Sequence, residues 1–287
     1  MLGVSQIALN EEDYDTSITY AKRWLAETGS ERDTVYTVIA MAYYRQDKLA
    51  EVAEPAKKAL ALAEKPSDSM YQLVVQSFYD RELWADAARE ADEILAKKPD
   101  LLPVIKLQSQ AYLEMEGGES KAAAALQGAY DRGVLSSEND IRHLASIYSY
   151  IERPLDAVTL INNAVAANKL KPSLDTYKVL GDGLRYGDKY VEAAEAYSKA
   201  EPFAKNGEIL YLKALALYEG EKYPECKQAA TAAVEKGGYE RLGETWLTLG
   251  NCELEMDNLP AAKAAYTKAL GYPNTKESAA SWLKSVR

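Results

Sequence analysis

One motif recurs along this chain at a nearly constant interval, and that interval is the strongest constraint on its fold. The clearest copy opens at Trp246, continues with Leu249 and Gly250, and closes with Tyr266 and Ala269. Equivalents of Trp246, which we call marker positions, are 35, 35, 34, 36, 36, 33 and 36 residues apart and fall at Met1, Tyr36, Tyr71, Ile105, Ile141, Tyr177, Leu210 and Trp246. A period of this length is typical of stacked repeats, each of which contacts only its neighbours.

Small residues recur at two fixed distances after each marker, and they predict where two helices cross. Sixteen places after the marker the residues are Ser17, Val52, Ala87, Ala157, Ala193, Cys226 and Ala262, with Ala122 one place late in the fourth copy. Seven places further they are Ala59, Ala129, Ala164, Ala200, Ala233 and Ala269, with Trp24 and Ile94 as exceptions. Small side chains let helix backbones approach closely, so each copy is predicted to be an antiparallel helix pair.

The copy opened by Tyr177 repeats the pattern of the last copy, with Leu180, Gly181, Tyr197 and Ala200 in the same places. These residues, and the W-x2-L-G opening at Trp246, resemble tetratricopeptide repeats along essentially the whole chain. The resemblance implies an all-α chain, a right-handed α-solenoid of about eight tandem helix-turn-helix repeats with a C-terminal capping helix. The implied organisation is a solenoid over 1–274, with repeats near 1–32, 33–67, 68–101, 102–137, 138–173, 174–206, 207–242 and 243–274, and a capping helix over 275–287.

The two ends of the array carry different signals. After the last copy, Asn274 and Glu277 fit an N-cap and its third-position partner, and apolar residues then follow at helical spacing at Ala279, Trp282, Leu283 and Val286. This helix is expected to cover the open end of the last repeat. At the other end the marker is Met1 itself, so the first repeat lacks its opening residues and we expect the natural chain to begin earlier.

Composition excludes several classes of function. The formal net charge of −10 argues against nucleic acid, because Lys and Arg supply most of the affinity for phosphates. No run approaches the ~18 apolar residues that span a bilayer. The single histidine, His143, removes His-based metal clusters, and no pair of carboxylates is marked as acid and base. We therefore predict no enzyme activity, no metal and no cofactor.

Two local features carry separate expectations. Pro55 lies well inside the predicted second helix of its copy and should kink it, whereas Pro154, Pro224 and Pro260 fall in first turns, where proline is tolerated. The two cysteines, Cys226 and Cys252, are expected to be buried as small apolar residues. A bridge between them is the alternative, which the sequence leaves open.

The family resemblance also implies a binding surface. In tetratricopeptide repeats the residues one, five, eight and nine places after the marker usually line a concave groove formed by the first helices. The candidate partner-binding residues are Thr37, Met41, Tyr44, Arg45, Gln72, Gln76, Tyr79, Lys106, Gln110, Arg142, Ser146, Tyr150, Lys178, Asp182, Arg185, Tyr186, Tyr211 and Tyr218.

Tyrosines and cations dominate this set. Tyrosine rings can cover apolar side chains while their hydroxyls bind a peptide backbone, and a basic centre at Lys106, Arg142, Lys178 and Arg185 would attract carboxylates. The predicted ligand is a protein or a peptide, with carboxylates as a preferred feature. In the alternative interpretation several of the tyrosines fill the seam between neighbouring first helices.

A second resemblance concerns the cellular location of the protein. Tyr-rich, acidic arrays of this length are similar to tetratricopeptide proteins of the bacterial envelope, including those encoded beside TonB systems. This similarity favours a periplasmic location, with the cytoplasm as the alternative. We therefore expect a non-catalytic interaction scaffold, and a solenoid that self-assembles through its open ends is the competing hypothesis.

Overall fold

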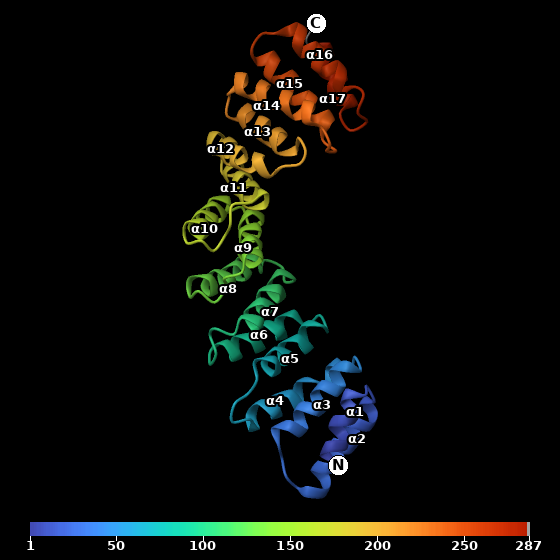
Figure 1. Cartoon of the computed structure of the whole chain (residues 1–287). Coiled ribbons are helices and arrows are strands. Elements are labelled where there is room, and N and C mark those ends of the chain that lie inside the picture. Colours follow the sequence, from blue (N-terminus) through green and yellow to red (C-terminus); the bar gives the residue numbers. More distant parts are fainter. Residues whose placement is uncertain (286–287) are drawn as a thin grey trace. The chain divides into compact units, whose positions relative to one another are not determined.

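The computed structural model describes residues 1–285, and its contacts divide the chain into two compact units, which we describe separately. Unit 1 covers residues 1–136 and unit 2 begins at Ser137. All secondary structure of the described residues is helical, which confirms the predicted all-α fold of paired helices. Successive helices along the chain lie side by side in pairs within each unit (Figure 1).

Unit 1 consists of four helix pairs. They are α1 (Leu2–Asn10) with α2 (Tyr14–Thr28), α3 (Asp33–Arg45) with α4 (Ala53–Leu62), α5 (Asp68–Tyr79) with α6 (Trp84–Leu95), and α7 (Leu102–Leu113) with α8 (Glu119–Asp131). A short 3-10 turn, η1 (Leu49–Glu51), precedes α4. In each pair the first helix packs on the next helix, which we call the second helix. The marker lies within the first helix, except that Met1 immediately precedes α1.

Unit 2 contains four further pairs and one additional helix. They are α9 (Glu138–Tyr150) with α10 (Pro154–Ala166), α11 (Leu174–Tyr186) with α12 (Tyr190–Ala200), α13 (Glu208–Glu219) with α14 (Tyr223–Lys236), α15 (Leu242–Glu255) with α16 (Leu259–Ala269), and then α17 (Lys276–Ser285). The 3-10 turn η2 (Glu201–Phe203) follows α12.

Glycine and tyrosine meet where the helices of two of these pairs cross. A Cβ atom added to Gly181 would lie 2.5 Å from the Tyr197 ring, and one added to Gly250 would lie 2.4 Å from the Tyr266 ring. Both rings are fully buried. Neither glycine can therefore be enlarged unless the ring moves, which is the close approach that the sequence motif predicted.

The turn between the two helices of a pair has the same backbone shape in every copy. One residue in each turn has φ between 57° and 69°, a left-handed conformation that is uncommon outside glycine. The residue is Gly117 in the fourth copy, and in the others it is acidic: Glu12, Asp47, Glu82, Glu152, Asp188, Glu221 and Asp257. This shared turn fixes the path from first to second helix.

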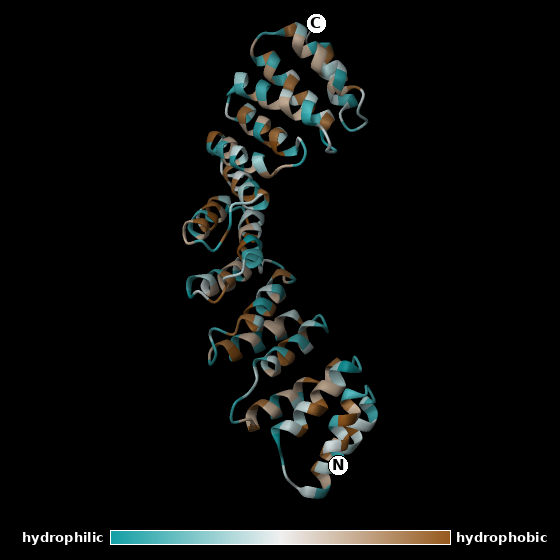
Figure 2. Cartoon of the chain, viewed as in Figure 1, coloured by the Kyte–Doolittle hydropathy of each residue, from teal (hydrophilic) through white to brown (hydrophobic). Residues whose placement is uncertain are grey.

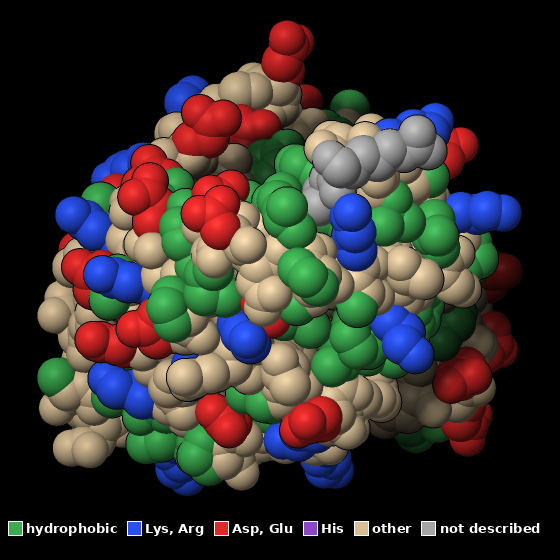
Figure 3. Space-filling model, turned by 90° about the horizontal axis from the view of Figure 1, so that it is seen from above, with side chains coloured by type: hydrophobic (Ala, Val, Ile, Leu, Met, Phe, Trp, Pro, Cys, Tyr) green, Lys and Arg blue, Asp and Glu red, His purple; other side chains and the backbone are tan. Residues whose placement is uncertain are grey.

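Hydrophilic and hydrophobic residues are mixed along most helices (Figure 2). On the face seen in Figure 3, acidic and basic side chains are interspersed with apolar ones, without a large area of one sign. None of the helices within residues 1–285 combines the length and the apolar character that crossing a membrane requires.

The predicted kink at Pro55 is wrong because the helix begins later than expected. The turn η1 occupies the segment in which the sequence predicted the first turn of the second helix. The helix α4 starts at Ala53, which places Pro55 in its first turn, where no intrahelical N–H bond is lost.

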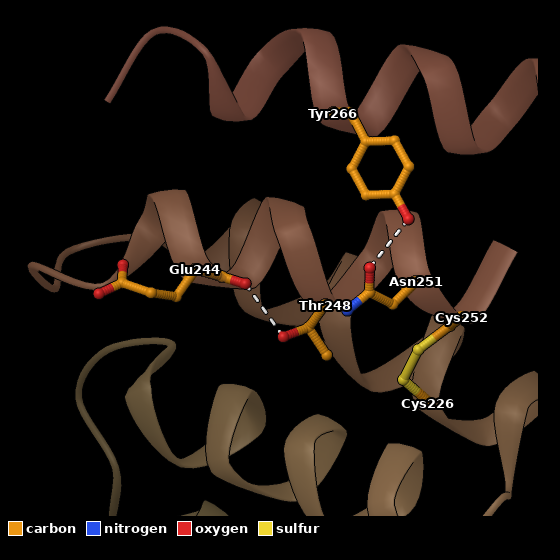
Figure 4. Close-up of a disulfide and its surroundings, with 6 residues drawn as sticks. All are labelled: Cys226, Glu244, Thr248, Asn251, Cys252 and Tyr266. Carbon is orange, nitrogen blue, oxygen red and sulfur yellow. Dashed lines mark hydrogen bonds between the residues drawn. A yellow bond between two sulfur atoms is a disulfide. The ribbon is translucent and has the colours of Figure 1, made fainter. Parts of the chain in front are cut away.

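Both cysteines are buried as expected, and of the two alternatives that the sequence left open, the bridge is the one found. Cys226 on α14 and Cys252 on α15 form a disulfide, with Cα atoms 6.2 Å apart, and both residues are fully buried (Figure 4). The bond joins the second helix of one pair to the first helix of the next pair. The sequence could not predict it, since the distance depends on how neighbouring pairs stack.

The last helix, α17, packs on α16 as predicted for a helix that covers the final pair. Its Trp282 ring stacks on Tyr266 with centroids 5.8 Å apart and planes 10° from parallel. The helix begins at Lys276, after Thr275 rather than after the predicted cap Asn274. Val286, which the sequence pattern assigns to this helix, lies outside the described residues.

Candidate binding groove

A groove of about 610 Å³ lies over the first helices α3 and α5 of unit 1. Its lining consists of Met41, Tyr44, Arg45, Asp47, Leu49, Ser69, Gln72, Leu73, Gln76 and Asp80. Five of these residues belong to the predicted set: Met41, Tyr44, Arg45, Gln72 and Gln76. The structure therefore brings part of the predicted set together in one hollow.

The groove combines an apolar floor with polar groups that can bind a peptide. Met41, Leu49 and Leu73 supply apolar side chains. Arg45 is exposed and forms no hydrogen bond or ion pair with the described residues. The amide of Gln72 likewise has no hydrogen-bond partner within residues 1–285. These two side chains keep their donors available.

The far wall of the groove is held by internal hydrogen bonds. The Tyr44 hydroxyl donates to Asp80 at 3.1 Å, which joins α3 to the end of α5. The Gln76 amide also donates to the Asp80 carboxylate. Partial burial is the larger cause that raises the pKa of Tyr44, and the hydrogen bond to Asp80 raises it further. This hydroxyl is therefore protonated at neutral pH.

A second hollow of about 290 Å³ adjoins the groove. It is lined by Leu9, Asn10, Glu12, Tyr14, Met41 and Arg45. Met41 and Arg45 line both hollows. Together the two hollows run from the end of α1 across α3 to α5, over three successive first helices of unit 1.

In unit 2 the predicted cations are paired with neighbouring side chains. Arg185 forms two hydrogen bonds of 2.6 Å to the Glu219 carboxylate. Lys178 lies 2.9 Å from Asp182, which also accepts a 2.7 Å hydrogen bond from the hydroxyl of Tyr197. These carboxylates occupy the donors that the sequence assigned to a ligand.

The two remaining predicted cations belong to different units. Arg142 on α9 lies 3.2 Å from Glu138 and donates to Asn139. Lys106 on α7 is half-buried and has an interaction partner of its own. A single basic centre extending from Lys106 to Arg185 therefore stays a prediction.

Four of the predicted tyrosines outside the groove lie in two kinds of environment. Tyr150 and Tyr186 are exposed, at 73% and 64%. Tyr79 packs against Trp84, with ring centroids 4.8 Å apart, and Tyr218 packs in the same way against Tyr223 at 6.0 Å. These two rings pack inside their own helix pair, on the second helix, and not on a neighbouring first helix.

The remaining predicted residues do not line the groove of unit 1. Tyr211 is buried at 3% exposure, and its hydroxyl accepts a hydrogen bond of 2.9 Å from Arg241. Thr37 is half-buried, while Gln110 and Ser146 are exposed.

Sequence reasoning missed several residues that line the groove. Asp47 and Leu49 come from the turn after α3, and Ser69 and Leu73 come from the first half of α5. The motif gives no signal for them because they lie at other distances from the marker. It also missed a hollow of about 460 Å³ in unit 2, between the second helices α12 and α14.

Clusters of metal ligands offer no further candidate site. Among residues 1–285 there is no group of three or more His, Cys, Asp or Glu side chains that could hold a metal ion.

Comparisons with known proteins give likeness in structure alone. No protein-family model matches the chain, and no curated protein matches it. A tetratricopeptide repeat protein from Parabacteroides merdae is 11% identical, with 88% of this chain and 98% of that chain covered and a TM-score of 0.48. The C-terminal part of a TPR repeat-containing protein from Cytophaga hutchinsonii is 15% identical, with 98% of each chain covered and a TM-score of 0.48.

A third similar structure is the TPR2AB domain of yeast Sti1 in its pHSP90 complex. It is 12% identical, with 88% of this chain and 98% of that chain covered and a TM-score of 0.41. In the present chain, a helix pair follows every marker position, and small residues lie where the helices cross. The chain thus has an all-α fold of tandem helix pairs at the spacing of tetratricopeptide repeats.

Proposed function

We propose that this chain is a non-catalytic interaction module that binds an extended peptide in the groove of unit 1. The observation that carries the proposal is the groove of about 610 Å³, in which Arg45 lies beside an apolar floor and has no ion pair within residues 1–285. An apolar surface with a few convergent polar groups is the usual composition of a binding site.

The length of the ligand follows from the spacing of the helices. Packed helices lie about 8–10 Å apart, so the path from α1 across α3 to α5 measures about 20 Å. An extended chain covers about 3.3 Å per residue, and about six residues would fill the path. The ligand is therefore a short extended segment.

The chemistry of the lining indicates which side chains that segment carries. An aliphatic side chain would lie over Met41, Leu49 and Leu73, and an acidic side chain would bind the Arg45 guanidinium, whose planar donors fit a carboxylate. The Gln72 amide can donate to a peptide carbonyl. We infer a preference for aliphatic and acidic residues next to one another.

Fluorescence polarisation with labelled peptides tests the proposal. The probe Ser-Leu-Asp-Leu-Ser-Gly should bind the whole chain, and Ser-Leu-Lys-Leu-Ser-Gly serves as the charge-reversed control. Arg45→Glu should weaken binding of the acidic probe about tenfold, which is about 1.4 kcal/mol. The matched variant Arg142→Glu, in unit 2, should leave it unchanged. Equal affinities for the two probes, or equal effects of the two variants, would exclude the groove.

The disulfide supports one cellular compartment for this module, the periplasm. Structural disulfides persist in oxidising compartments and are rare in the cytosol. We therefore place the protein in the periplasm, in a bacterial envelope complex of the TonB type that the sequence resemblance suggests. Protein isolated from its native compartment should contain no free thiols when assayed in denaturant, and two free thiols per chain would exclude this location.

A further inference from the structure

The hollow of about 460 Å³ in unit 2 is a groove with a helical floor and two helical walls, which we call the outer groove. Its floor is α13, which packs against both α12 and α14. The floor residues Leu210, Lys213 and Leu217 are spaced three and four residues apart, so they share one side of α13. The walls carry small side chains, which are Ala194 and Ser198 on α12 and Ala229 and Ala232 on α14.

An ion pair crosses the equivalent hollow in unit 1, which is smaller at about 290 Å³. There the Lys57 ammonium binds the Glu90 carboxylate. Lys57 lies 21 places after its marker, and Glu90 lies 19 places after the next marker. In the outer groove these two places hold Ser198 and Ala229, which are too short to meet. The outer groove therefore stays open where its counterpart in unit 1 is closed.

The cation on the floor of the outer groove is an exception at its register. Lys213 lies three places after its marker, where five other copies have a buried apolar residue: Ile39, Val74, Leu144, Leu180 and Leu249. The fourth copy has Gln108 there, and its amide donates to Asp92 at 2.6 Å. Lys213 is half-buried, and its ammonium lies 3.9 Å from the Glu201 carboxylate, which is too far for a hydrogen bond. Its donors therefore have no acceptor within residues 1–285.

The walls of the outer groove also carry charges without partners among the described residues. Glu195 on α12 and Glu225 on α14 are exposed and form no ion pair or hydrogen bond with residues 1–285. The same holds for Lys222, which lies just before α14. The outer groove thus combines a cation on an apolar floor with one unpaired carboxylate on each wall.

We propose that the outer groove binds an amphipathic α-helix of a partner protein. On the side that faces α13, this helix carries aliphatic residues and one Asp or Glu between them, and it carries Lys or Arg on both flanks. The central carboxylate binds the Lys213 ammonium, and the aliphatic residues lie over Leu210 and Leu217. The flanking cations bind Glu195 and Glu225.

The lining of the outer groove favours a helix over an extended peptide. An extended backbone needs hydrogen-bond partners, whereas a helix bonds its own N–H and C=O groups. The Ser198 hydroxyl already donates to the Ala194 carbonyl. A six-residue peptide such as the one proposed for the groove of unit 1 is too short to form a stable helix. The two grooves therefore have different ligands.

Isothermal titration calorimetry with two capped peptides and the full chain tests the proposal. The acidic peptide SLAALAAKEAALKAALA has a glutamate between leucines on one side and a lysine on each flank. The control peptide SLAALAAKQAALKAALA has glutamine in place of that glutamate. The chain should bind the acidic peptide about tenfold more tightly, because a carboxylate binds the Lys213 ammonium more strongly than a neutral amide does. Equal affinities, or no binding of either peptide, would overturn the proposal.

Replacing the floor cation separates binding from folding. Lys213→Leu should fold normally, since leucine occupies this register in three other copies, and thermal unfolding verifies that it does. The variant should bind the two peptides equally. The matched variant Lys199→Leu, at an exposed position of α12 outside the groove, should keep the preference of about tenfold. A preference that persists in Lys213→Leu would overturn the proposal.

A second variant closes the outer groove. Ser198→Lys together with Ala229→Glu places the residue types of Lys57 and Glu90 at the same register, so an ion pair should cross the groove as it does in unit 1. Binding of both peptides should weaken about tenfold while the circular dichroism of the chain stays unchanged. Undiminished binding to this folded variant would place the peptides elsewhere and overturn the proposal.

Two other occupants of the outer groove would give different results. Decanoate, a carboxylate on an apolar chain, should not bind. If it bound and Lys213→Leu abolished that binding while neither peptide bound, the groove would be a lipid site. Light scattering should show a monomer at all concentrations. A dimer that Lys213→Leu dissociates would assign the groove to a second copy of this chain.

Discussion

Two of the four helix pairs in unit 2 place a tyrosine ring against a glycine, whereas the first three pairs of unit 1 have neither residue at the same register. Four and twenty places after the marker they have Ser5 and Ala21, Ala40 and Ala56, and Val75 and Ala91, all of which are buried. In unit 2, Gly181 meets Tyr197 and Gly250 meets Tyr266. Unit 2 also has the disulfide between α14 and α15.

The two units differ in the same way in their charged groups. In unit 2, Arg185 of one copy binds Glu219 of the next copy. In unit 1 the equivalent contact is made by the Tyr44 hydroxyl, which donates to Asp80. Because a neutral hydroxyl occupies this carboxylate, the neighbouring Arg45 has no acidic partner among the described residues. Unit 1 thus has Tyr44 at the register where unit 2 has Arg185, and the cation that stays available is Arg45.

The comparison suggests a division of roles between the units. Unit 2 pairs Arg185 with a carboxylate of the next copy and is stabilised by a covalent bond, while unit 1 exposes Arg45 beside its groove. The following predictions test that division, from the largest expected effect to the smallest.

Removing the disulfide should destabilise unit 2 alone. The bond closes a loop with a sequence separation of 26 residues, and loops of this size contribute about 3 kcal/mol through the entropy of the unfolded chain. Cys226→Ala with Cys252→Ala should lower the free energy of unfolding of unit 2 by that amount. Hydrogen exchange in urea measures the protection of both units in one sample. If α3 and α5 of unit 1 lost as much protection as the helices of unit 2, the two units would not unfold separately.

Enlarging a crossing glycine should have the next largest effect. Gly181→Ala forces a methyl group against the buried Tyr197 ring and should cost about 1–3 kcal/mol. The control is Gly3→Ala in α1, where nothing lies within 4 Å of the added atom and the higher helix propensity of alanine should stabilise by up to about 1 kcal/mol. Chemical denaturation of both variants gives the two values. Opposite signs are expected, and a stabilising Gly181→Ala would contradict the described crossing.

Alkaline pH should weaken unit 2 through its buried tyrosines. Burial raises the pKa of Tyr197 and of Tyr266 above that of a free tyrosine. A raised pKa contributes stability below the unfolded pKa of about 10, and this contribution is lost as the pH rises above it. The free energy of unfolding of unit 2 should therefore fall above about pH 10. Tyr197→Phe should make the fall shallower, and an unchanged slope would show that this hydroxyl does not titrate on unfolding.

The helix pairs could be predicted from the sequence because their signal is local. A small residue such as Ala193, at a fixed distance from its marker, is required wherever two backbones approach, so its spacing alone locates the crossing. The glycines Gly181 and Gly250 were assigned to crossings on the same ground, and the structure places a ring against each of them. The late start of α4 was missed because a 3-10 turn leaves the spacing unchanged.

The binding residues were harder to predict because they depend on contacts between copies. Arg45 and Arg185 lie one register position apart, and the sequence motif predicts both as ligand-binding cations. Arg185 binds a carboxylate of the next copy, whereas Arg45 has no ion pair with the described residues. The disulfide was left open for the same reason, since Cys226 and Cys252 lie in different copies. The sequence motif lies within one copy. It therefore describes each helix pair but not how one pair stacks on the next.

Hydrogen–deuterium exchange with the peptide Ser-Leu-Asp-Leu-Ser-Gly bound tests the central claim most directly. If unit 1 binds the ligand, the peptide should slow exchange in α3, in α5 and in the turn around Asp47, and leave α9 to α17 unchanged. Protection confined to unit 2, or protection in unit 1 that persists in Arg45→Glu at the same peptide concentration, would contradict the account.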